Sequence, residues 1–330
     1  MGVVDEDRED FFKWLISKGY SYKKNDFVPR QIFGIYLEDL LESALKIADE
    51  KNISYEFLSK EISEIGIKNK HYLIDGNAYN HCILATGVRL KNCNKNFWHV
   101  DIKKHLHEKE IHISGCGLTA FDAAISLHNL NYEGVIFMHS RSGKMPQVHQ
   151  IVDSGEKVNP PLSIEDSALP LSLIFKKFVK NCKNLANWRL CFDAMRPLTQ
   201  DFWSKLSAEK KKRFMRHCIR LWNIHRHRCP ESQFAAITKM IDSGKLVLVK
   251  KRSNAENVID CTGFDYGFKS KLISGLIANG IAKFDDLESG IVSQYDNFYV
   301  MGGLNFGSIF EITAAPDIAP QARKISRHIF

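Results

Sequence analysis

The 330-residue sequence predicts an α/β fold with two domains, each built around parallel strands. Two apolar strands end in Thr-Gly, within HCILATG (residues 81–87) and NVIDCTG (residues 257–263). Between them, EIHISGCGLTAFDAAISL (residues 110–127) combines a β-branched strand, two glycines and a helical pattern of small residues. A strand, a tight turn and a helix followed by another strand are typical of a βαβ unit. The two Thr-Gly strands therefore indicate where the chain leaves one domain for the other and where it returns.

Local patterns predict the elements along the chain. An extended stretch around Pro29 leads into an amphipathic helix of about five turns, with apolar residues at helical spacing from Ile35 to Ala48 and a stop near Asn52. The Asp75-Gly76 pair predicts a hairpin turn, and HCILATG a buried parallel strand. Further elements are expected at residues 110–127 (strand, turn and helix), 134–139 (strand), 170–242 (helical segment), 246–249 and 257–263 (strands), 297–307 (strand into a glycine-rich loop) and 308–329 (terminal helix).

Composition and charge limit the classes of protein to which the chain can belong. Hydrophobic residues make up 44% and charged residues 25%, which is ordinary for a globular protein of this length. The net charge is +8, but the basic residues are dispersed, and we interpret the run at residues 210–213 as a solvated helix face. The acidic N-terminal sequence does not resemble a signal peptide, and no apolar run has the length of a membrane span. We expect a small-molecule substrate and neither a nucleic-acid nor a membrane partner.

The cysteines indicate a reducing compartment. Eight are present, with no Cys-x-x-Cys pair and no regular spacing, and several lie in apolar strand patterns. This usage is typical of reduced thiols in a cytoplasmic protein.

The segment RHCIRLWNIHRHRCPE (residues 216–231) gathers histidines and cysteines, so a metal site must be weighed. Helical metal ligands are usually three or four residues apart so that they share a face, whereas His225 and His227 are two apart. We predict no metal site. A helix with a basic edge fits better, with Arg226 and Arg228 placed to meet a phosphate or a carboxylate.

The turn Gly115-x-Gly117-x-x-Ala120 predicts a dinucleotide site. The first glycine permits a tight turn, the second lets backbone amides approach a pyrophosphate, and the small third residue lets the helix pack on the strand. The alternative is a glycine turn that only packs. Because a strand precedes the turn and a second strand follows at the usual distance, the nucleotide site is favoured. The residues expected to bind the cofactor here are Gly115, Gly117, Leu118, Thr119, Ala120, Ser140 and Arg141.

The identity of the nucleotide follows from the end of the second strand. NAD sites usually place an acidic residue there, but this sequence has Ser140 and Arg141. A guanidinium suits a 2′-phosphate, so NADPH is favoured over NADH. The alternative for Arg141 is a surface ion pair.

Catalytic side chains are weakly indicated. No nucleophile elbow, His-Glu-x-x-His or Walker lysine loop is present, which gives hydrolase and NTPase interpretations no support. His149 follows the nucleotide-site strand and is a candidate general acid, with a simple polar contact as the alternative. Arg226 is the second candidate.

Several segments together resemble a known family. FVPRQIFGIYLEDLL, ILATG, ISGCGLTAFDAAISL, SRSGKMPQVH, LWNIHRHRCPE, VIDCTGF and MGGLNFGSIFEITAAPDIAPQA occur over nearly the whole chain. Their order resembles a bacterial family of FAD/NAD(P)-binding flavoproteins that is related to the flavin-dependent N-hydroxylating monooxygenases. The resemblance implies an FAD domain interrupted by an NADPH domain, with hydride passing from NADPH to flavin. It also implies FAD contacts at Arg30, Thr86, Gly87, Gly263, Gly303, Glu311, Ile312 and Thr313, the last three at the start of the terminal helix.

The sequence also departs from that family. A first strand, a Gly-x-Gly-x-x-Gly turn and a first helix normally precede the region that begins here at Met1, and no glycine turn after an apolar strand occurs before Phe27. About eight residues stand between Val249 and Val258, where the family has a strand hairpin. A missing first strand leaves backbone groups unpaired, and a missing turn removes amides that hold the FAD pyrophosphate. A fragment of a longer protein, a decayed relative and a repurposed fold are all consistent with these gaps.

These observations together predict an α/β fold of two dinucleotide-binding (Rossmann-like) domains. The FAD-type domain, residues 1–90 and 255–330, lacks its first strand, turn and helix; the NADP-type domain, residues 91–254, is inserted and carries the helical segment. The predicted function is an FAD- and NADPH-dependent oxidoreductase, with a flavin monooxygenase as one form, although the missing turn argues against tight FAD binding. The alternative is a truncated, non-enzymatic relative that keeps only a nucleotide-binding or interaction role.

Overall fold

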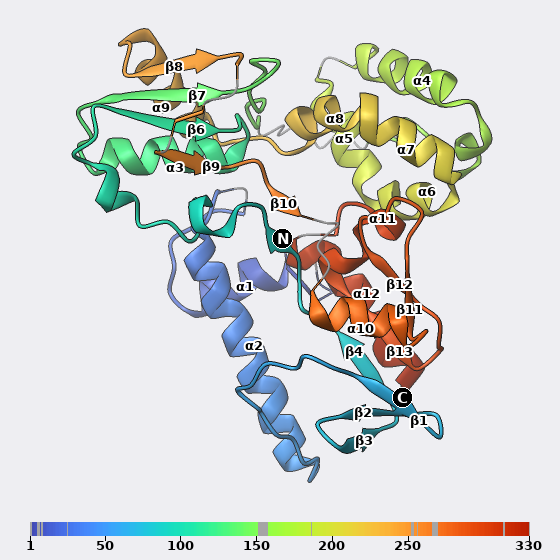
Figure 1. Ribbon diagram of the computed structural model, residues 1–330. Helices are drawn as coiled ribbons and strands as arrows, with labels where there is room; N and C mark the ends of the chain where they lie inside the picture. Colours follow the sequence, from blue (N-terminus) through green and yellow to red (C-terminus); the bar gives the residue numbers. More distant parts are fainter. Residues whose placement is uncertain are drawn as a thin grey trace.

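A computed structural model describes residues 2–4, 7, 9–24, 26–150, 158–185, 187–251, 254–255, 257–265, 270–312 and 314–329. The chain forms three parts (Figure 1): a parallel sheet with its helices, a lobe of helices, and a part that brings N-terminal and C-terminal segments together. The predicted α/β class is confirmed, because helices alternate with parallel strands in the sheet that carries the Gly115 turn. None of the helices in the described part of the chain is both long and apolar enough to cross a bilayer.

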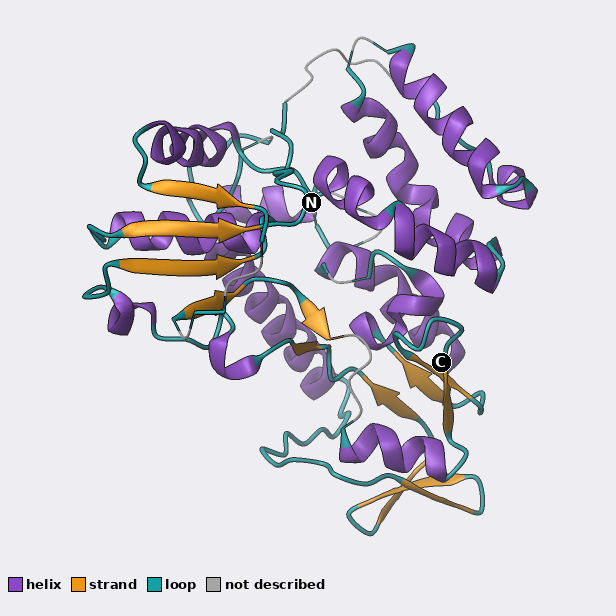
Figure 2. Cartoon of the chain, turned by 45° about the horizontal axis from the view of Figure 1, so that its top comes forward, coloured by secondary structure: helices purple, strands orange, loops and turns teal. Residues whose placement is uncertain are grey.

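The part that carries the Gly115 turn, called here the nicotinamide-type part, is a four-stranded parallel sheet whose strands lie side by side at the left of Figure 2. Its strand order is β8-β7-β6-β9, so β6 is central and pairs with β7 and β9. The helices α3 and α9 pack against each other and against the sheet, and their apolar faces share one core with the strands. The bounds are β6 (Glu110–Ser114), α3 (Leu118–Asn129), β7 (Val135–His139), α9 (Glu231–Asp242), β8 (Leu246–Val249) and β9 (Val258–Asp260).

This sheet confirms the predicted strands and corrects one predicted boundary. The strands expected at residues 110–113, 134–139 and 246–249 are all present. The expected boundary after residue 254 would place β9 in the flavin-type domain, but β9 pairs with β6, with Ser114 opposite Asp260. The chain therefore returns to the flavin-type part only after Cys261. Sequence pattern alone missed this because a strand ending in Thr-Gly fits either sheet.

The two crossings between the parts lie side by side. β5 (Arg89–Leu90) follows the first Thr-Gly segment and β10 (Phe264–Asp265) follows the second, and they pair in antiparallel fashion. Gly263 has a φ of +93°, and its carbonyl accepts a hydrogen bond from the backbone N–H of Lys91 at 3.3 Å. Backbone pairing therefore holds the outgoing and returning chain together, as two Thr-Gly strands around an insertion predict.

The flavin-type part is built on two parallel strands, β4 and β13, joined across more than 200 residues of sequence. The predicted turn at Asp75-Gly76 joins two strands of an antiparallel meander and is confirmed, with positive φ at both residues. The bounds are β1 (Gly66–Lys68), β2 (His71–Ile74), β3 (Asn77–Tyr79), β4 (Cys82–Leu84), α10 (Lys271–Ala278), β11 (Ala282–Phe284), β12 (Ile291–Ser293), β13 (Phe298–Val300), α11 (Phe306–Ile309) and α12 (Ala315–Ile329).

Two N-terminal helices pack against each other beside this part. In α1 (Asp10–Ser17) and α2 (Arg30–Glu50), the buried contacts are made by Phe11, Leu15 and Tyr36. The predicted helix is confirmed and is longer than expected, because it starts directly after Pro29. Its outer apolar residues remain exposed, including Ile35, Leu37, Leu41 and Ile47. Among the described residues, nothing covers this face.

The helical lobe contains five of the helices predicted within residues 170–242. It is built around aromatic side chains, whereas α9, the last helix of the predicted segment, belongs to the nicotinamide-type sheet. The basic run at residues 210–213 is not wholly solvated, because Lys211 is 7% exposed and lies over the Trp203 ring. Burial lowers the pKa of Lys211. The bounds are α4 (Leu171–Lys183), α5 (Arg189–Met195), α6 (Thr199–Lys205), α7 (Ala208–His217) and α8 (Ile219–Arg226).

Gly115 is the glycine on which the nicotinamide-type sheet depends. Its φ is +116°, and a Cβ there would lie 2.6 Å from the Cys261 carbonyl oxygen. We therefore expect Gly115→Ala to lower the free energy of unfolding by about 1–3 kcal/mol from backbone strain alone, with more from the contact. Gly117 has a φ of −97° and open space where a Cβ would lie, so Gly117→Ala is the matched control, with a loss under about 1 kcal/mol. Urea unfolding measures both; equal losses would contradict this assignment.

Candidate functional site

The first candidate site is the turn between β6 and α3. The backbone N–H of Gly115 donates to the His139 carbonyl at 2.9 Å, and Cys261 N–H donates to the Ser114 carbonyl at 2.8 Å. These bonds fix the end of β6 between β7 and β9. The chain then passes extended Gly117 and enters α3 at Leu118. The amino end of a twelve-residue helix is thereby placed at the carboxyl edge of the sheet, where parallel α/β sheets bind ligands.

The first turn of α3 offers free donors. No side chain caps this helix, and no acceptor in the described part of the chain meets the backbone N–H groups of Leu118 and Thr119. Among the described residues, leaving out its two chain neighbours, no atom lies within 4 Å of the position that a Cβ of Gly117 would occupy, whereas Ala120 is fully buried against the sheet. The roles of these residues in binding a nucleotide stay predictions. A helix end of this kind suits a phosphate group.

Ser140 and Arg141 lie beside this turn. Ser114 and His139 are paired in the sheet, so the residues that follow them emerge side by side. The N–H of Ser140 donates to the Val249 carbonyl at 2.8 Å, which anchors the start of the loop. Arg141 is exposed and forms no ion pair with any residue that the structure describes. Its guanidinium is therefore available to a ligand at the same edge.

His149 lies where three segments meet. Its backbone N–H donates to the Cys229 carbonyl at 2.8 Å. Its imidazole ring contacts the Phe27 ring edge to face, with 5.2 Å between the ring centroids. Burial, followed by the nearby charge of Arg228, lowers the pKa of His149. The folded surroundings therefore disfavour the protonated form of the imidazole, and these contacts support the polar-contact interpretation at least as well as a general acid.

A second candidate site lies at the carboxyl edge of the flavin-type sheet. β4 and β13 are parallel, with Leu84 opposite Val300, so Thr86 and Gly87 emerge next to Gly303. Gly87 has a φ of +71°, and a Cβ on Gly303 would lie 2.4 Å from a methyl carbon of Val88. The structure thus brings together three of the residues expected to contact FAD. Beyond β13, the chain first forms a 3₁₀ turn and the four-residue α11, and the longer helix α12 begins only at Ala315.

Two other expected FAD residues lie elsewhere. Arg30 begins α2 and is placed beside α3, with Nη2 3.9 Å from Asp122 Oδ2 and the guanidinium 5.7 Å from the Trp98 ring centroid. Gly263 lies at the return crossing. Arg30 therefore lies beside α3, the helix that follows the Gly115 turn, whereas its predicted role placed it along FAD.

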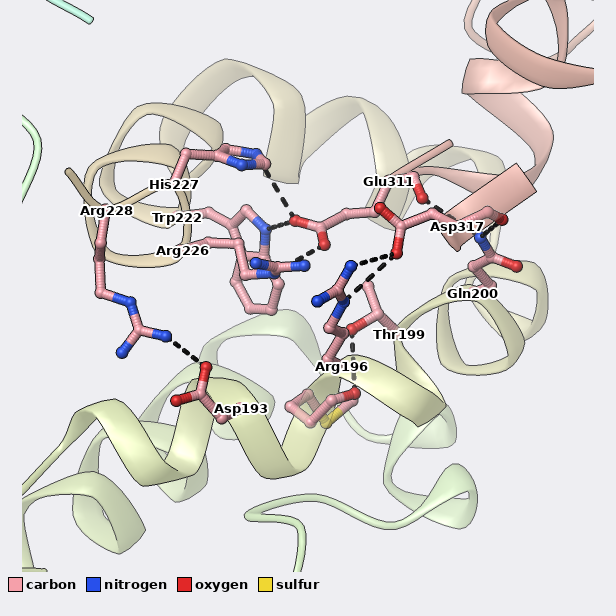
Figure 3. A network of polar contacts seen from close by, with 11 residues as sticks. Asp193, Arg196, Thr199, Gln200, Trp222, Arg226, His227, Arg228, Glu311 and Asp317 are labelled. Carbon is pink, nitrogen blue, oxygen red and sulfur yellow. Dashed lines mark hydrogen bonds and ion pairs between the residues drawn. The ribbon is translucent and has the colours of Figure 1, made fainter. Parts of the chain in front are cut away.

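Glu311 occupies the centre of a buried polar network (Figure 3). The indole N–H of Trp222 donates to Glu311 Oε1 at 2.6 Å, and Arg226 Nε donates to Oε2 at 2.9 Å. His227 Nε2 lies 3.8 Å from Oε1. The Gln200 amide donates to the backbone carbonyls of Glu311 at 3.2 Å and Asp317 at 3.0 Å. This network fastens the link between α11 and α12 to the helical lobe.

The terminal helix begins later than predicted, because residues 310–314 form a link between α11 and α12. α12 begins at Ala315, so Glu311 and Ile312 precede it, and Thr313 lies outside the described residues. Ile312 is fully buried in the aromatic cluster, and the Glu311 carboxylate faces the lobe. Phe310 and Glu311 have φ values of +58° and +44°, a strained conformation that persists only where surrounding contacts impose it. The side chains of Glu311 and Ile312 therefore hold the lobe in place and do not line an open cofactor site.

Arg226 and its neighbours also find their partners within the chain. Arg226 meets a carboxylate, as its basic edge predicts, but that carboxylate is Glu311. Arg228 is 4% exposed in its side chain and pairs with Asp193. Among the described residues, no three His, Cys, Asp or Glu side chains gather closely enough to hold a metal ion.

Sequence reasoning missed Trp222 as a partner of Glu311. Trp222 and Arg226 are four residues apart and so share one face of α8. That spacing could have indicated that the two side chains meet the same partner. It also missed a histidine pair across the sheet, in which His112 Nδ1 lies 2.8 Å from His139 Nε2. Nothing in the local sequence indicates that contact, because it depends on strand register.

Comparison with known proteins adds three findings. Residues 1–89 match the model of a family described as FAD-NAD(P)-binding. No curated protein matches the sequence. Among solved structures, the cadaverine monooxygenase of desferrioxamine biosynthesis from Erwinia amylovora, bound to FAD, has 11% identity and a TM-score of 0.56, over 96% of this chain and 77% of that one. 

Two further solved structures are similar to this chain in fold. The ornithine N-hydroxylase of Kutzneria sp. 744, with reduced FAD, NADP+ and L-ornithine, has 14% identity and a TM-score of 0.57, over 98% of this chain and 83% of that one. The L-lysine 6-monooxygenase of Pseudomonas syringae has 13% identity and a TM-score of 0.50, over 90% and 82%. This chain has the fold of these monooxygenases. The predicted pair of dinucleotide-binding domains is therefore confirmed at the level of fold.

The Glu311–Arg226 pair makes a testable contribution to stability. Removing one partner of a buried ion pair leaves the other charge uncompensated, so Glu311→Ala should lower the free energy of unfolding by about 3–5 kcal/mol. The Glu311→Ala/Arg226→Ala double variant should lose less than the sum of the single losses. Glu209→Ala is the control, because Glu209 is exposed and its 4.0 Å contact with Arg213 should contribute under about 1 kcal/mol. Additive losses in chemical denaturation would exclude the coupling.

The lowered pKa of His149 predicts a pH dependence of stability. The unfolded chain takes up a proton near the ordinary pKa of 6.5, whereas the folded chain takes it up only at lower pH. The free energy of unfolding should therefore fall as the pH falls through this range, and His149→Gln should reduce the slope between about pH 7.5 and 5.5. His227, whose pKa burial also lowers, contributes in the same direction. His128→Gln, at an exposed position of α3, is the control, and an unchanged slope in the His149 variant would contradict the assignment.

Proposed function

We propose that this chain is an NADPH- and flavin-dependent oxidoreductase in which NADPH binds at the turn formed by Gly115, Gly117 and the amino end of α3. The single observation that carries the proposal is the set of free backbone donors on α3, which face open space at the carboxyl edge of a parallel sheet. Arg141, exposed and without an ion pair among the described residues, supplies the matching charge for a 2′-phosphate.

The residues of the nicotinamide-type part fit NADPH. The amides of Leu118 and Thr119 would hold the pyrophosphate, while Gly115 and Ala120 keep strand and helix in register. Bound NADPH supplies a hydride. His149, neutral through its surroundings, would act there as a hydrogen-bonding group, and its anchored backbone fixes the ring.

FAD is supported less completely by this chain. The family match over residues 1–89 and the FAD found with the Erwinia and Kutzneria enzymes support a flavin as the second cofactor. Thr86, Gly87 and Gly303 form an edge against which it would lie. Among the described residues, neither β4 nor β13 leads directly into a helix longer than four residues, so we expect FAD to bind less tightly than a dinucleotide held at the amino end of a long helix.

A nucleotide-binding module without redox activity is the alternative, and it is less favoured because the similarity in fold to FAD-dependent monooxygenases extends over nearly the whole chain. The free thiols among the described cysteines support a reducing, cytoplasmic location for either function.

The identity of the nucleotide is tested by Arg141→Ala. Loss of a charge-assisted hydrogen bond should weaken NADPH binding about 10- to 100-fold and leave NADH binding unchanged. Titration calorimetry with both nucleotides measures the change. Arg327→Ala, on an exposed turn of α12, is the control. Equal losses for NADPH and NADH would contradict 2′-phosphate recognition.

The flavin is tested by absorbance. The purified chain is incubated with excess FAD, and NADPH is then added without oxygen, beside a sample of FAD and NADPH without the chain. The proposal predicts that NADPH bleaches the flavin bands only where the chain is present. A chain that binds NADPH but leaves the flavin bands unchanged would establish the nucleotide-binding module in place of the flavoenzyme.

A further inference from the structure

The helical lobe encloses a cavity that the proposed function does not use. It has a volume of about 460 Å³, within the range of small-molecule sites, and lies among α4, α5, α6 and α8. Its walls are mainly apolar and aromatic, with Ile174 and Phe178 on α4, Phe192 on α5, Trp222 on α8 and Phe310 behind them. This cavity is therefore a built site of the kind that takes an organic ligand.

Four of the polar groups in the wall already have hydrogen-bond partners within the protein. Thr199 donates to the Met195 carbonyl at 3.0 Å, and His225 Nδ1 lies 2.7 Å from the Leu221 carbonyl oxygen. The indole N–H groups of Trp203 and Trp222 donate to Gly307 and Glu311. A polar ligand would lose its hydrogen bonds to water here and regain few of them. An apolar chain would lose none, so the interior selects an apolar ligand.

The mouth of the cavity carries charge of one sign. Phe175, 44% exposed, and Val179 lie at the rim on α4 together with Lys183. Next to it, a shallow hollow on α4 is lined by Lys176, Lys180 and Lys183, none of which forms an ion pair with the residues that the structure describes. Lys183 lines both the cavity and the hollow, with Lys176 and Lys180 beside it, and this positive charge complements a ligand with an anionic head.

We propose that the lobe binds a single-chain fatty carboxylate, with its carboxylate at Lys183 and its chain inside the cavity. The far end of the chain then lies toward Phe310, which stacks on Trp203 with 4.4 Å between ring centroids. Trp222 lines the cavity and donates to Glu311, so a bound chain contacts the residue that fastens the α11–α12 link. Binding requires neither NADPH nor FAD, so the site stands or falls independently of the proposed redox function.

The test is a titration of the cofactor-free chain with dodecanoate, kept below its micelle concentration. Trp188, Trp203 and Trp222 line the cavity, so intrinsic fluorescence reports occupancy. Saturable binding is expected. Val179→Trp, which narrows the rim at a half-buried position, should abolish it, while circular dichroism verifies that the variant is folded. Absence of a saturable signal, or wild-type affinity in folded Val179→Trp, would overturn the proposal.

The head group is tested by charge reversal. Lys183→Glu should weaken dodecanoate binding about five- to tenfold and leave binding of the uncharged dodecan-1-ol unchanged. Lys239→Glu, an equal charge change at an exposed position of α9, should affect neither ligand. Equal affinity of Lys183→Glu and the wild type for dodecanoate would overturn the placement of the carboxylate.

Discussion

The left-handed turn at Gly115 determines the geometry of everything around it. Its backbone N–H donates to the His139 carbonyl at the end of β7, and its missing side chain lets the carbonyl of Cys261, the residue after β9, approach closely. The chain then leaves Gly115 in the direction of α3. One residue thus sets the spacing of three strands and aims the amino end of a helix at the sheet edge. Because those amides have no partner within the described protein, the same turn that stabilises the sheet also leaves donors for an anion.

The rest of the molecule is organised around two long-range connections. β4 and β13 join sequence positions more than 200 residues apart, and β5 with β10 ties the two crossings together. A third connection, the buried Glu311 network, fastens the C-terminal segment to the helical lobe. The flavin-type sheet depends on fewer contacts than the nicotinamide-type sheet, and its helix α2 shows an apolar face to solvent. The part with the more complete core also carries the more complete nucleotide site.

Local sequence predicted the features that depend on local physics. The Gly115 turn, the Asp75-Gly76 hairpin and the α2 helix follow from backbone preference and hydrophobic spacing, and all are present. Features that depend on long-range pairing were wrong or missed. The strand at Val258 was placed in the other domain, because Thr-Gly does not specify a sheet. Glu311 was expected along a cofactor at a helix start, but its partner Arg226 lies 85 residues earlier in the sequence and draws the carboxylate into the lobe.

The central claim is that a nicotinamide dinucleotide binds at the Gly115 turn. Amide hydrogen exchange of the chain with and without saturating NADP+ measures this directly, residue by residue. A nicotinamide dinucleotide bound at this turn should slow exchange at residues 117–121 and 140–142 and leave the amides after β4 and β13 unchanged. Unchanged exchange at residues 117–121, or protection confined to the segments after β4 and β13, would contradict it.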